Sequence, residues 1–277
     1  MTAVLLALGA SLSWGVGDFL GGVSSRRLPT VTVLAVSQAA GLVAVGITAA
    51  VLAEGPPGAR ALAFAVAAGA GGVVGLGALY RGMAVGAIAI VAPISAAGAA
   101  VPVAVGLAQG ERPSPLQLAG ICLALGGVAL ASHERGPAGT RVAAGVGLAL
   151  VAALGFGLYF VLIDESSAAS PLWAVLVARA TSSALALAVA AQMRRLGAAP
   201  RDLPVLVLIG LFDVAANGLL VLALTRGLVS VVPVLASLYP VATVLLARGL
   251  LGEQVARGQQ AGVGIALGGV ALISAGQ

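Results

Sequence analysis

Long apolar runs, separated by short segments that hold most of the charged residues, dominate this 277-residue chain. Ten runs can be marked, at residues 3–22, 30–53, 61–80, 84–107, 115–132, 143–163, 171–193, 203–224, 228–247 and 259–275. Apolar side chains are continuous within each run, whereas the strands of a membrane barrel alternate. The hydrocarbon core of a bilayer needs about 20 apolar residues per helix. The pattern therefore predicts ten transmembrane helices with short loops.

Composition supports an all-α membrane protein. Hydrophobic residues make up 60% of the chain and charged residues 8%, and the mean hydropathy is +1.13. Soluble domains carry about 25% charged residues, so a water-soluble globule is excluded. The net charge of +5 comes from scattered arginines and forms no basic block, which argues against a nucleic-acid partner. With the single cysteine Cys122, no intrachain disulfide can form.

The second half of the chain repeats the first. The stretch "ALGGVALAS" at Ala124–Ser132 returns as "ALGGVALIS" at Ala266–Ser274, displaced by 142 residues. Between residues 111 and 132, twelve of 22 positions are identical at this displacement. Glu111, Gln117 and Pro29 also fall on identical residues, which a bias toward Ala, Leu and Gly does not explain. We interpret the chain as two copies of a five-span unit, at residues 1–137 and 143–277.

An odd number of spans in each copy determines the expected architecture. The second copy enters the membrane upside down relative to the first, so the halves are expected to be inverted-topology repeats. Proteins built in this way typically bind substrates near the bilayer midplane and expose the site to each side in turn. Duplication also occurs in channels and enzymes, so transport is favoured without being required.

Arginine positions favour one orientation of these spans. Ten arginines are expected on the side of the first connection: Arg26, Arg27, Arg81, Arg135, Arg141, Arg194, Arg195, Arg201, Arg248 and Arg257. Three are expected on the side of the termini: Arg60, Arg112 and Arg226. Because cytoplasmic loops are rich in arginine, this bias places both termini outside the cell.

The sequence resembles the EamA repeats of the drug/metabolite transporter superfamily over essentially its whole length. The resemblance is carried by "RGLVSVVPVLASLYPVATVLLARGLLGEQVARGQQAGVGIALGGVALIS" (Arg226–Ser274) and "SWGVGDFLGG" (Ser13–Gly22), with a weaker counterpart of the latter at 143–162. It implies a ten-helix transporter of small metabolites or drugs, with a cavity lined by the first four helices of each half. The fifth and tenth helices are then peripheral.

The resemblance and the residues disagree on two points. The family is drawn with cytoplasmic termini, in conflict with the arginine bias, so both orientations stay open. In the first copy Gly98 stands in the place of Pro240, so the bend there can differ from that of the second copy.

Prolines at matching places interrupt the fourth and ninth runs. Each proline removes a backbone donor and frees a carbonyl, which must face protein or a wet cavity at membrane depth. Interrupted helices in corresponding positions indicate a transport site, although prolines also kink helices for packing alone. The candidate helix breaks are Pro93, Pro102, Pro233 and Pro240.

Two charged residues lie deep inside runs. Arg179 is in the seventh run and Asp213 in the eighth. Each costs about 2.5–3.5 kcal/mol at a helix centre, so a partner is required. We expect them to pair, with Arg179 able to hold a carboxylate or phosphate and Asp213 an amine or a coupling proton. A purely structural ion pair is the alternative. Asn217, one turn after Asp213, shares its face of the helix.

Further candidates line the same expected cavity. Asp18 lies one turn after Trp14, either as a protonation or cation site in the cavity or in the headgroup region. Tyr239 precedes the proline of the ninth run and is expected to line the cavity, as is Tyr159. A further pair, Tyr80 and Trp173, lies near run ends, where aromatic residues anchor helices at the membrane interface.

These features favour a secondary active transporter of a small polar or amphipathic metabolite or drug, working by alternating access. Export is the expected direction and proton coupling is a candidate; a flippase for a lipid-linked carrier is the alternative. The sequence shows no catalytic, phosphate-binding or metal-ligand motif, so we expect no enzyme activity, cofactor or metal site. The expected partners are the lipid bilayer, a small-molecule substrate and protons, and the expected location is the inner membrane of a bacterium.

Overall fold

The computed structural model describes residues 1–132, 140–252 and 257–276. In these ranges the chain is helical apart from short connections, and it forms no strand. In chain order the helices are α1 Thr2–Ser25, α2 Thr30–Leu52, α3 Ala59–Val85, α4 Ile88–Ala96, the 3₁₀ turn η1 Ala97–Ala99, α5 Ala100–Ala108, α6 Pro115–Ser132, α7 Thr140–Ser167, α8 Pro171–Gln192, α9 Leu203–Leu224, α10 Val232–Ala236, α11 Tyr239–Leu251 and α12 Arg257–Ala275.

Eight helical stretches of the described chain are long and apolar enough to cross a membrane. They are Thr2–Ser25, Thr30–Leu52, Ala59–Val85, Ile90–Ala108, Gly145–Ser167, Pro171–Gln192, Leu203–Leu224 and Val232–Leu251. Each coincides with one of the ten predicted runs. The fifth run corresponds to a shorter apolar helix, Pro115–Gly127 within α6, and the tenth to α12. The structure is thus a multi-span helical bundle in which eight of the ten expected spans are found by length and composition.

Helices of the two halves pack against one another in matched pairs. At the sequence displacement of 142, α1 corresponds to α7, α2 to α8, α3 to α9, α4 and α5 to α10 and α11, and α6 to α12. The pair α1–α9 is matched by α7–α3, the pair α2–α9 by α8–α3, the pair α1–α10 by α7–α4, and the pair α1–α11 by α7–α5. Counterparts meet directly in α2–α8 and α6–α12. If the first and second halves are exchanged, each of these helix pairs therefore becomes a pair that is also in contact.

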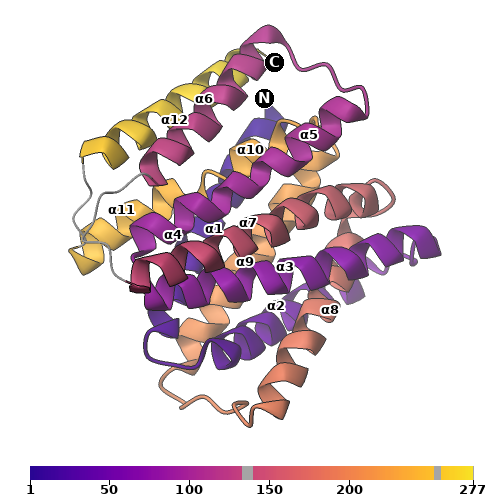
Figure 1. Cartoon of the computed structure of the whole chain (residues 1–277). Helices are drawn as coiled ribbons and strands as arrows, with labels where there is room; N and C mark the ends of the chain where they lie inside the picture. Colours follow the sequence, from indigo (N-terminus) through magenta and orange to yellow (C-terminus); the bar gives the residue numbers. More distant parts are fainter. Residues whose placement is uncertain (133–139, 253–256, 277) are drawn as a thin grey trace.

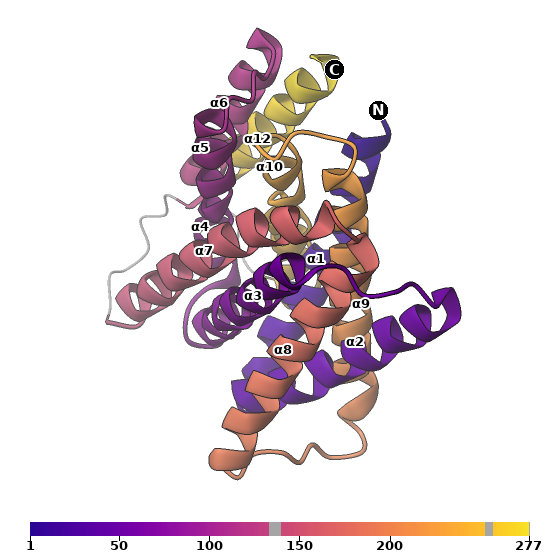
Figure 2. The ribbon, with the colours of Figure 1, turned by 90° about the vertical axis from the view of Figure 1, so that its right-hand side faces the viewer.

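The helix pair α6–α12 lies at the edge of the bundle, where α6 packs against α4. Figures 1 and 2 show these two helices side by side at one edge, far from α2 and α8. The start of α1 and the end of α12 lie at the same end of the molecule in both views. This arrangement agrees with the peripheral place that the family resemblance implies for the fifth and tenth helices.

The fourth and ninth runs, which contain the four prolines, are not uniform α-helices. The fourth run consists of α4 and α5 joined through η1. In the ninth run, α10 ends at Ala236 and α11 begins at Tyr239. The four prolines are all buried: Pro93 in α4, Pro102 in α5, Pro233 in α10 and Pro240 in α11.

Two glycines let the halves approach closely at the centre of the bundle. A Cβ atom at Gly210 in α9 would collide with the backbone carbonyl of Ser37 in α2. At the matching contact, a Cβ at Gly69 in α3 would collide with the carbonyl of Ala178 in α8. Small residues allow helices to pack at short separation in membranes. The contact at Gly210 brings α2 against α9 beside the polar side chains described below.

Replacing Gly210 with alanine should destabilise the fold, because the added methyl group meets a backbone carbonyl that cannot rotate away. Overpacking of this kind typically costs about 1–3 kcal/mol. The matched control is Gly218→Ala in the same helix, where a Cβ meets open space; alanine should be neutral or slightly stabilising there. The thermal stability of the two variants in detergent, compared with wild type, checks this. Equal stability of the two variants would contradict the close contact.

Candidate functional site

A cavity of about 70 Å³ lies among α1, α2, α3, α7, α8, α9 and α11, so both halves contribute to its wall. The structure brings together in this wall all seven side chains that were assigned to a cavity from the sequence: Trp14, Asp18, Tyr159, Arg179, Asp213, Asn217 and Tyr239. Gln38 and Ser182, which the sequence reasoning did not select, lie in the wall with them.

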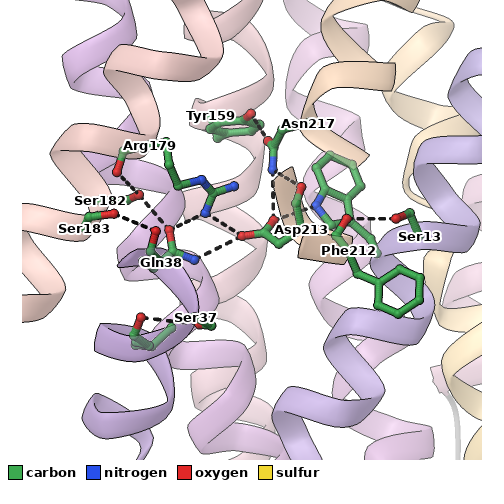
Figure 3. A network of polar contacts seen from close by, with 12 residues as sticks. Ser13, Ser37, Gln38, Tyr159, Arg179, Ser182, Ser183, Phe212, Asp213 and Asn217 are labelled. Atoms are coloured by element: carbon green, nitrogen blue, oxygen red, sulfur yellow. Dashed lines mark hydrogen bonds and ion pairs between the residues drawn. The ribbon is translucent and has the colours of Figure 1, made fainter. Parts of the chain in front are cut away.

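The Asp213 carboxylate is the centre of the polar network (Figure 3). Its Oδ1 atom accepts hydrogen bonds from Trp14 Nε1 at 3.0 Å and Asn217 Nδ2 at 2.9 Å. Its Oδ2 atom accepts from Gln38 Nε2 at 3.0 Å and from Arg179 Nη1 at 2.6 Å. The donors come from α1, α2 and α8 as well as from α9 itself. Asp213 is 7% exposed, so its charge is compensated by protein groups and little by solvent.

Arg179 completes the ion pair that its position in an apolar run predicted. Arg179 is 6% exposed, and its Nη1 atom also donates to Gln38 Oε1. The same amide oxygen accepts from Ser182 Oγ at 2.7 Å, and Ser183 Oγ donates to the Gln38 backbone carbonyl at 2.8 Å. Gln38 thus donates to the carboxylate and accepts from the guanidinium. The Arg179 Nε–H is buried without a partner, which leaves the cation with unused donor capacity.

Asn217 extends the network toward α7. Its amide nitrogen donates to both the carboxylate and the backbone carbonyl of Asp213, the latter at 2.7 Å. Its amide oxygen accepts a hydrogen bond from the Tyr159 hydroxyl. The network therefore reaches from α1 and α2 of the first half to α7, α8 and α9 of the second, and it holds these five helices together.

Aromatic rings form the apolar part of the wall. Trp14 and Phe160 lie edge to face with ring centroids 6.0 Å apart, as do Tyr159 and Phe160. Phe156 and Tyr239 are perpendicular at 6.4 Å. Edge-to-face pairs fix ring orientation, so this side of the cavity is a preformed apolar surface next to the ion pair.

A second carboxyl group in the cavity wall belongs to Asp18, which lies one turn after Trp14 in α1. Asp18 is 4% exposed and lines the cavity. The Tyr80 side chain lies beside it, and at Gly21 a Cβ would collide with the Tyr80 ring. The Tyr239 hydroxyl bonds that of Ser95, which links α11 to α4.

The structure places Tyr80 and the four prolines differently from what the sequence suggested. Tyr80, expected at the membrane interface, is fully buried beside Asp18. The four prolines do not line the cavity, and Tyr239 is the wall residue that the broken fourth and ninth spans supply. Hydroxyl groups satisfy carbonyls at the breaks: Ser95 Oγ bonds Ala92 O at 2.7 Å, and Ser237 Oγ bonds Val234 O at 2.8 Å.

Two wall residues, Gln38 and Ser182, were not predicted from the sequence, where little distinguishes them. Gln38 is the one side-chain amide in its apolar run, and Ser182 lies one turn after Arg179. No group of three or more His, Cys, Asp or Glu side chains that could hold a metal ion occurs within the described ranges. His133 and Glu134, in the connection between the halves, lie outside those ranges.

Comparison with known proteins identifies the family. The model of the EamA-like transporter family matches residues 1–133 and again 143–275. The chain belongs to the EamA-like transporter family. It is accordingly a multi-pass integral membrane protein of a transporter family within the drug/metabolite transporter superfamily.

Solved structures share the fold of this EamA-like protein. Matches extend to 23 chains. One, described as "Crystal structure of protein", is 19% identical over 98% of this chain and 95% of its own, with a TM-score of 0.73. At this identity the likeness shows the fold alone. No curated protein sequence matches the chain.

Breaking the ion pair from one side should cost more than removing it. Arg179→Met and Asp213→Leu each leave a buried charge unpaired, which typically lowers the free energy of unfolding by about 3–5 kcal/mol. The double variant should lose less than either single one. Unfolding in SDS-containing mixed micelles measures all three.

Ser13→Ala is the matched control for this cycle. It removes one interhelical hydrogen bond, from Ser13 Oγ to Phe212 O at 2.8 Å, and should cost about 0.6 kcal/mol, the average for such bonds in membranes. A double variant that loses the sum of the two single losses would show that the charges do not interact.

Proposed function

We propose that this protein is a secondary active transporter that moves a small polar or amphipathic metabolite across the cell membrane by alternating access. The observation that carries the proposal is the buried Arg179–Asp213 pair, which lies in a cavity walled by both halves. Ionisable residues inside spans are costly and usually mark substrate or ion pathways. A pair placed for packing alone would need no cavity beside it.

The proposed architecture is ten spans arranged as two inverted five-helix repeats, residues 1–137 and 143–277. Three observations support it: the sequence repeat at a displacement of 142, the matched packing of helices when the halves are exchanged, and the place of α6 and α12 on the fifth and tenth runs. In such repeats the substrate site lies at the interface of the halves, which is where the cavity is found.

Arg179 and Asp213 would recognise opposite charges on the substrate. A substrate carboxylate or phosphate can take the unused donors of Arg179, since guanidinium groups bind planar anions well. A substrate amine can take the place of Arg179 or Gln38 as a donor to Asp213. Trp14, Phe156 and Phe160 would then contact the apolar part of the molecule. A small metabolite with both charged and apolar parts fits this wall best.

The volume of the cavity indicates a contracted conformation. About 70 Å³ is far below the roughly 300–1,000 Å³ of pockets that enclose drug-sized ligands. Helices must therefore separate for a metabolite to enter. The interrupted spans are suited to this movement, and the Ser95–Tyr239 bond joins them across the two halves.

Export driven by a proton gradient is the direction and energy source that we propose, in the inner membrane of a bacterium. The exchange of a proton for a charged substrate would keep the buried site close to electroneutral. We propose no enzymatic activity, because the wall residues include no nucleophile held by a neighbouring base.

Uptake of pooled metabolites into proteoliposomes, followed by mass spectrometry, tests the function. We expect one or a few metabolites to accumulate with wild-type protein. Arg179→Gln should reduce their uptake roughly ten- to one-hundred-fold, because a hydrogen bond to a charged group contributes about 1.5–3 kcal/mol. Arg81→Gln, which changes an exposed arginine outside the cavity, should leave uptake unchanged. Uptake that survives Arg179→Gln undiminished would exclude this arginine from the substrate site.

A further inference from the structure

The cavity wall holds two carboxylates with very different surroundings. Asp213 has four side-chain donors, among them the cation Arg179. Asp18 is more deeply buried, at 4% exposure, and pairs with no cation in the described ranges. Arg179, the one cation among the described wall residues, is already bonded to Asp213.

The groups that face Asp18 come from three helices packed against α1. They are Tyr80 from α3, Tyr239 from α11 and the carboxylate of Asp213 from α9. None of them is positively charged. The Tyr80 hydroxyl is buried, and the Asp18 carboxyl is the one polar side-chain group within its reach among the described residues. A buried hydroxyl and a carboxyl that has no cationic partner therefore lie side by side next to the cavity.

Burial of this kind favours a neutral carboxyl. An ionised carboxylate without a partner is very costly in an apolar environment, whereas a protonated carboxyl costs much less and has one hydrogen to donate. The Tyr80 hydroxyl oxygen can accept that hydrogen. We propose that Asp18 is the proton-binding site of this transporter, with Tyr80 as its hydrogen-bond partner and with the bound proton exchanged for the substrate.

This inference rests on the proposed transport function. It assigns the coupling proton to Asp18 and not to Asp213. Protonation of Asp213 would remove an acceptor from its donors and leave Arg179 buried without a counter-charge. Protonation of Asp18 breaks none of the four hydrogen bonds that Asp213 accepts from side chains. A hydronium ion on the open side gives its proton to the Asp18 carboxylate and becomes water, an O–H bond forms on the carboxyl, and the proton passes to a water molecule, forming hydronium, when the cavity opens to the other side.

Charge balance explains how the proton and the substrate compete. The described wall carries one guanidinium and two carboxylates, Arg179, Asp18 and Asp213. Its net charge is zero with Asp18 protonated and negative with Asp18 ionised. A proton or the cationic group of a substrate restores neutrality, and the two exclude each other. Trp14, which lies one turn from Asp18 and bonds Asp213, connects the two sites.

Trp14 also supplies a reporter that needs no substrate. The chain has two tryptophans, Trp14 and the partly exposed Trp173. In a Trp173→Phe background, the emission of Trp14 should change with pH in proteoliposomes equilibrated at each pH. Adding Asp18→Asn should abolish this change, whereas adding Asp164→Asn, which alters an aspartate outside the cavity wall near the end of α7, should preserve it. A pH response that is absent, or that persists in Asp18→Asn, overturns the proposal.

Two further variants keep the test decisive if Asp18→Asn fails to fold. Asp18→Glu should retain a pH response with a changed midpoint. Tyr80→Phe removes a hydroxyl that bonds nothing else and should also shift the midpoint; an unchanged midpoint overturns its assigned role. Emission that follows sodium concentration at constant pH, and requires Asp18, overturns the choice of the proton.

Coupling is tested separately from proton binding. In the metabolite-uptake assay, an imposed pH gradient should drive wild-type protein and have no effect on Asp18→Asn. Uptake in wild type that ignores the gradient overturns coupling while transport stands. If no metabolite is taken up, the transport proposal fails, but the titration of Trp14 emission still decides whether Asp18 binds a proton.

Discussion

The Asp213 carboxylate imposes the main constraint on this structure, because a charge inside an apolar bundle has no water to solvate it. Its oxygens must be satisfied by protein donors, and these come from α1, α2, α8 and α9. Those helices can meet only if α2 and α9 pack at short distance, which Gly210 permits. The polar network and the glycine contact therefore depend on each other, and together they join the two halves.

The duplicated scaffold carries chemistry that is not duplicated. At the displacement of 142, the positions of Arg179, Asp213 and Asn217 are occupied in the first half by Ser37, Gly71 and Gly75. Conversely, Trp14 and Asp18 correspond to Phe156 and Phe160, which also line the cavity. One unit thus supplies two similar walls, and later divergence places the ion pair on one side and a carboxyl beside tyrosine on the other. An asymmetric site suits a substrate whose two ends differ.

Much of this could be predicted because membranes restrict what a sequence can do. Apolar runs locate the helices, and charges within them need partners, so the Arg179–Asp213 pair was foreseeable. Gln38 was not predicted because a neutral amide costs less free energy to bury in an apolar run than a charge does, so it is a weaker sequence signal. Tyr80 was expected at a helix end because its apolar run ends there, whereas α3 continues to Val85 and the ring is buried inside the protein. Which side chains face the cavity depends on helix rotation, which continuous apolar sequence does not encode.

A structure of the protein with one of the metabolites that it takes up would test the central claim most directly. The account predicts a charged group of the ligand within hydrogen-bonding distance of Arg179 or Asp213, and a changed set of bonds between that pair and Gln38. A ligand bound elsewhere, with the four hydrogen bonds of Asp213 intact, would contradict it and leave the pair a structural element of the fold.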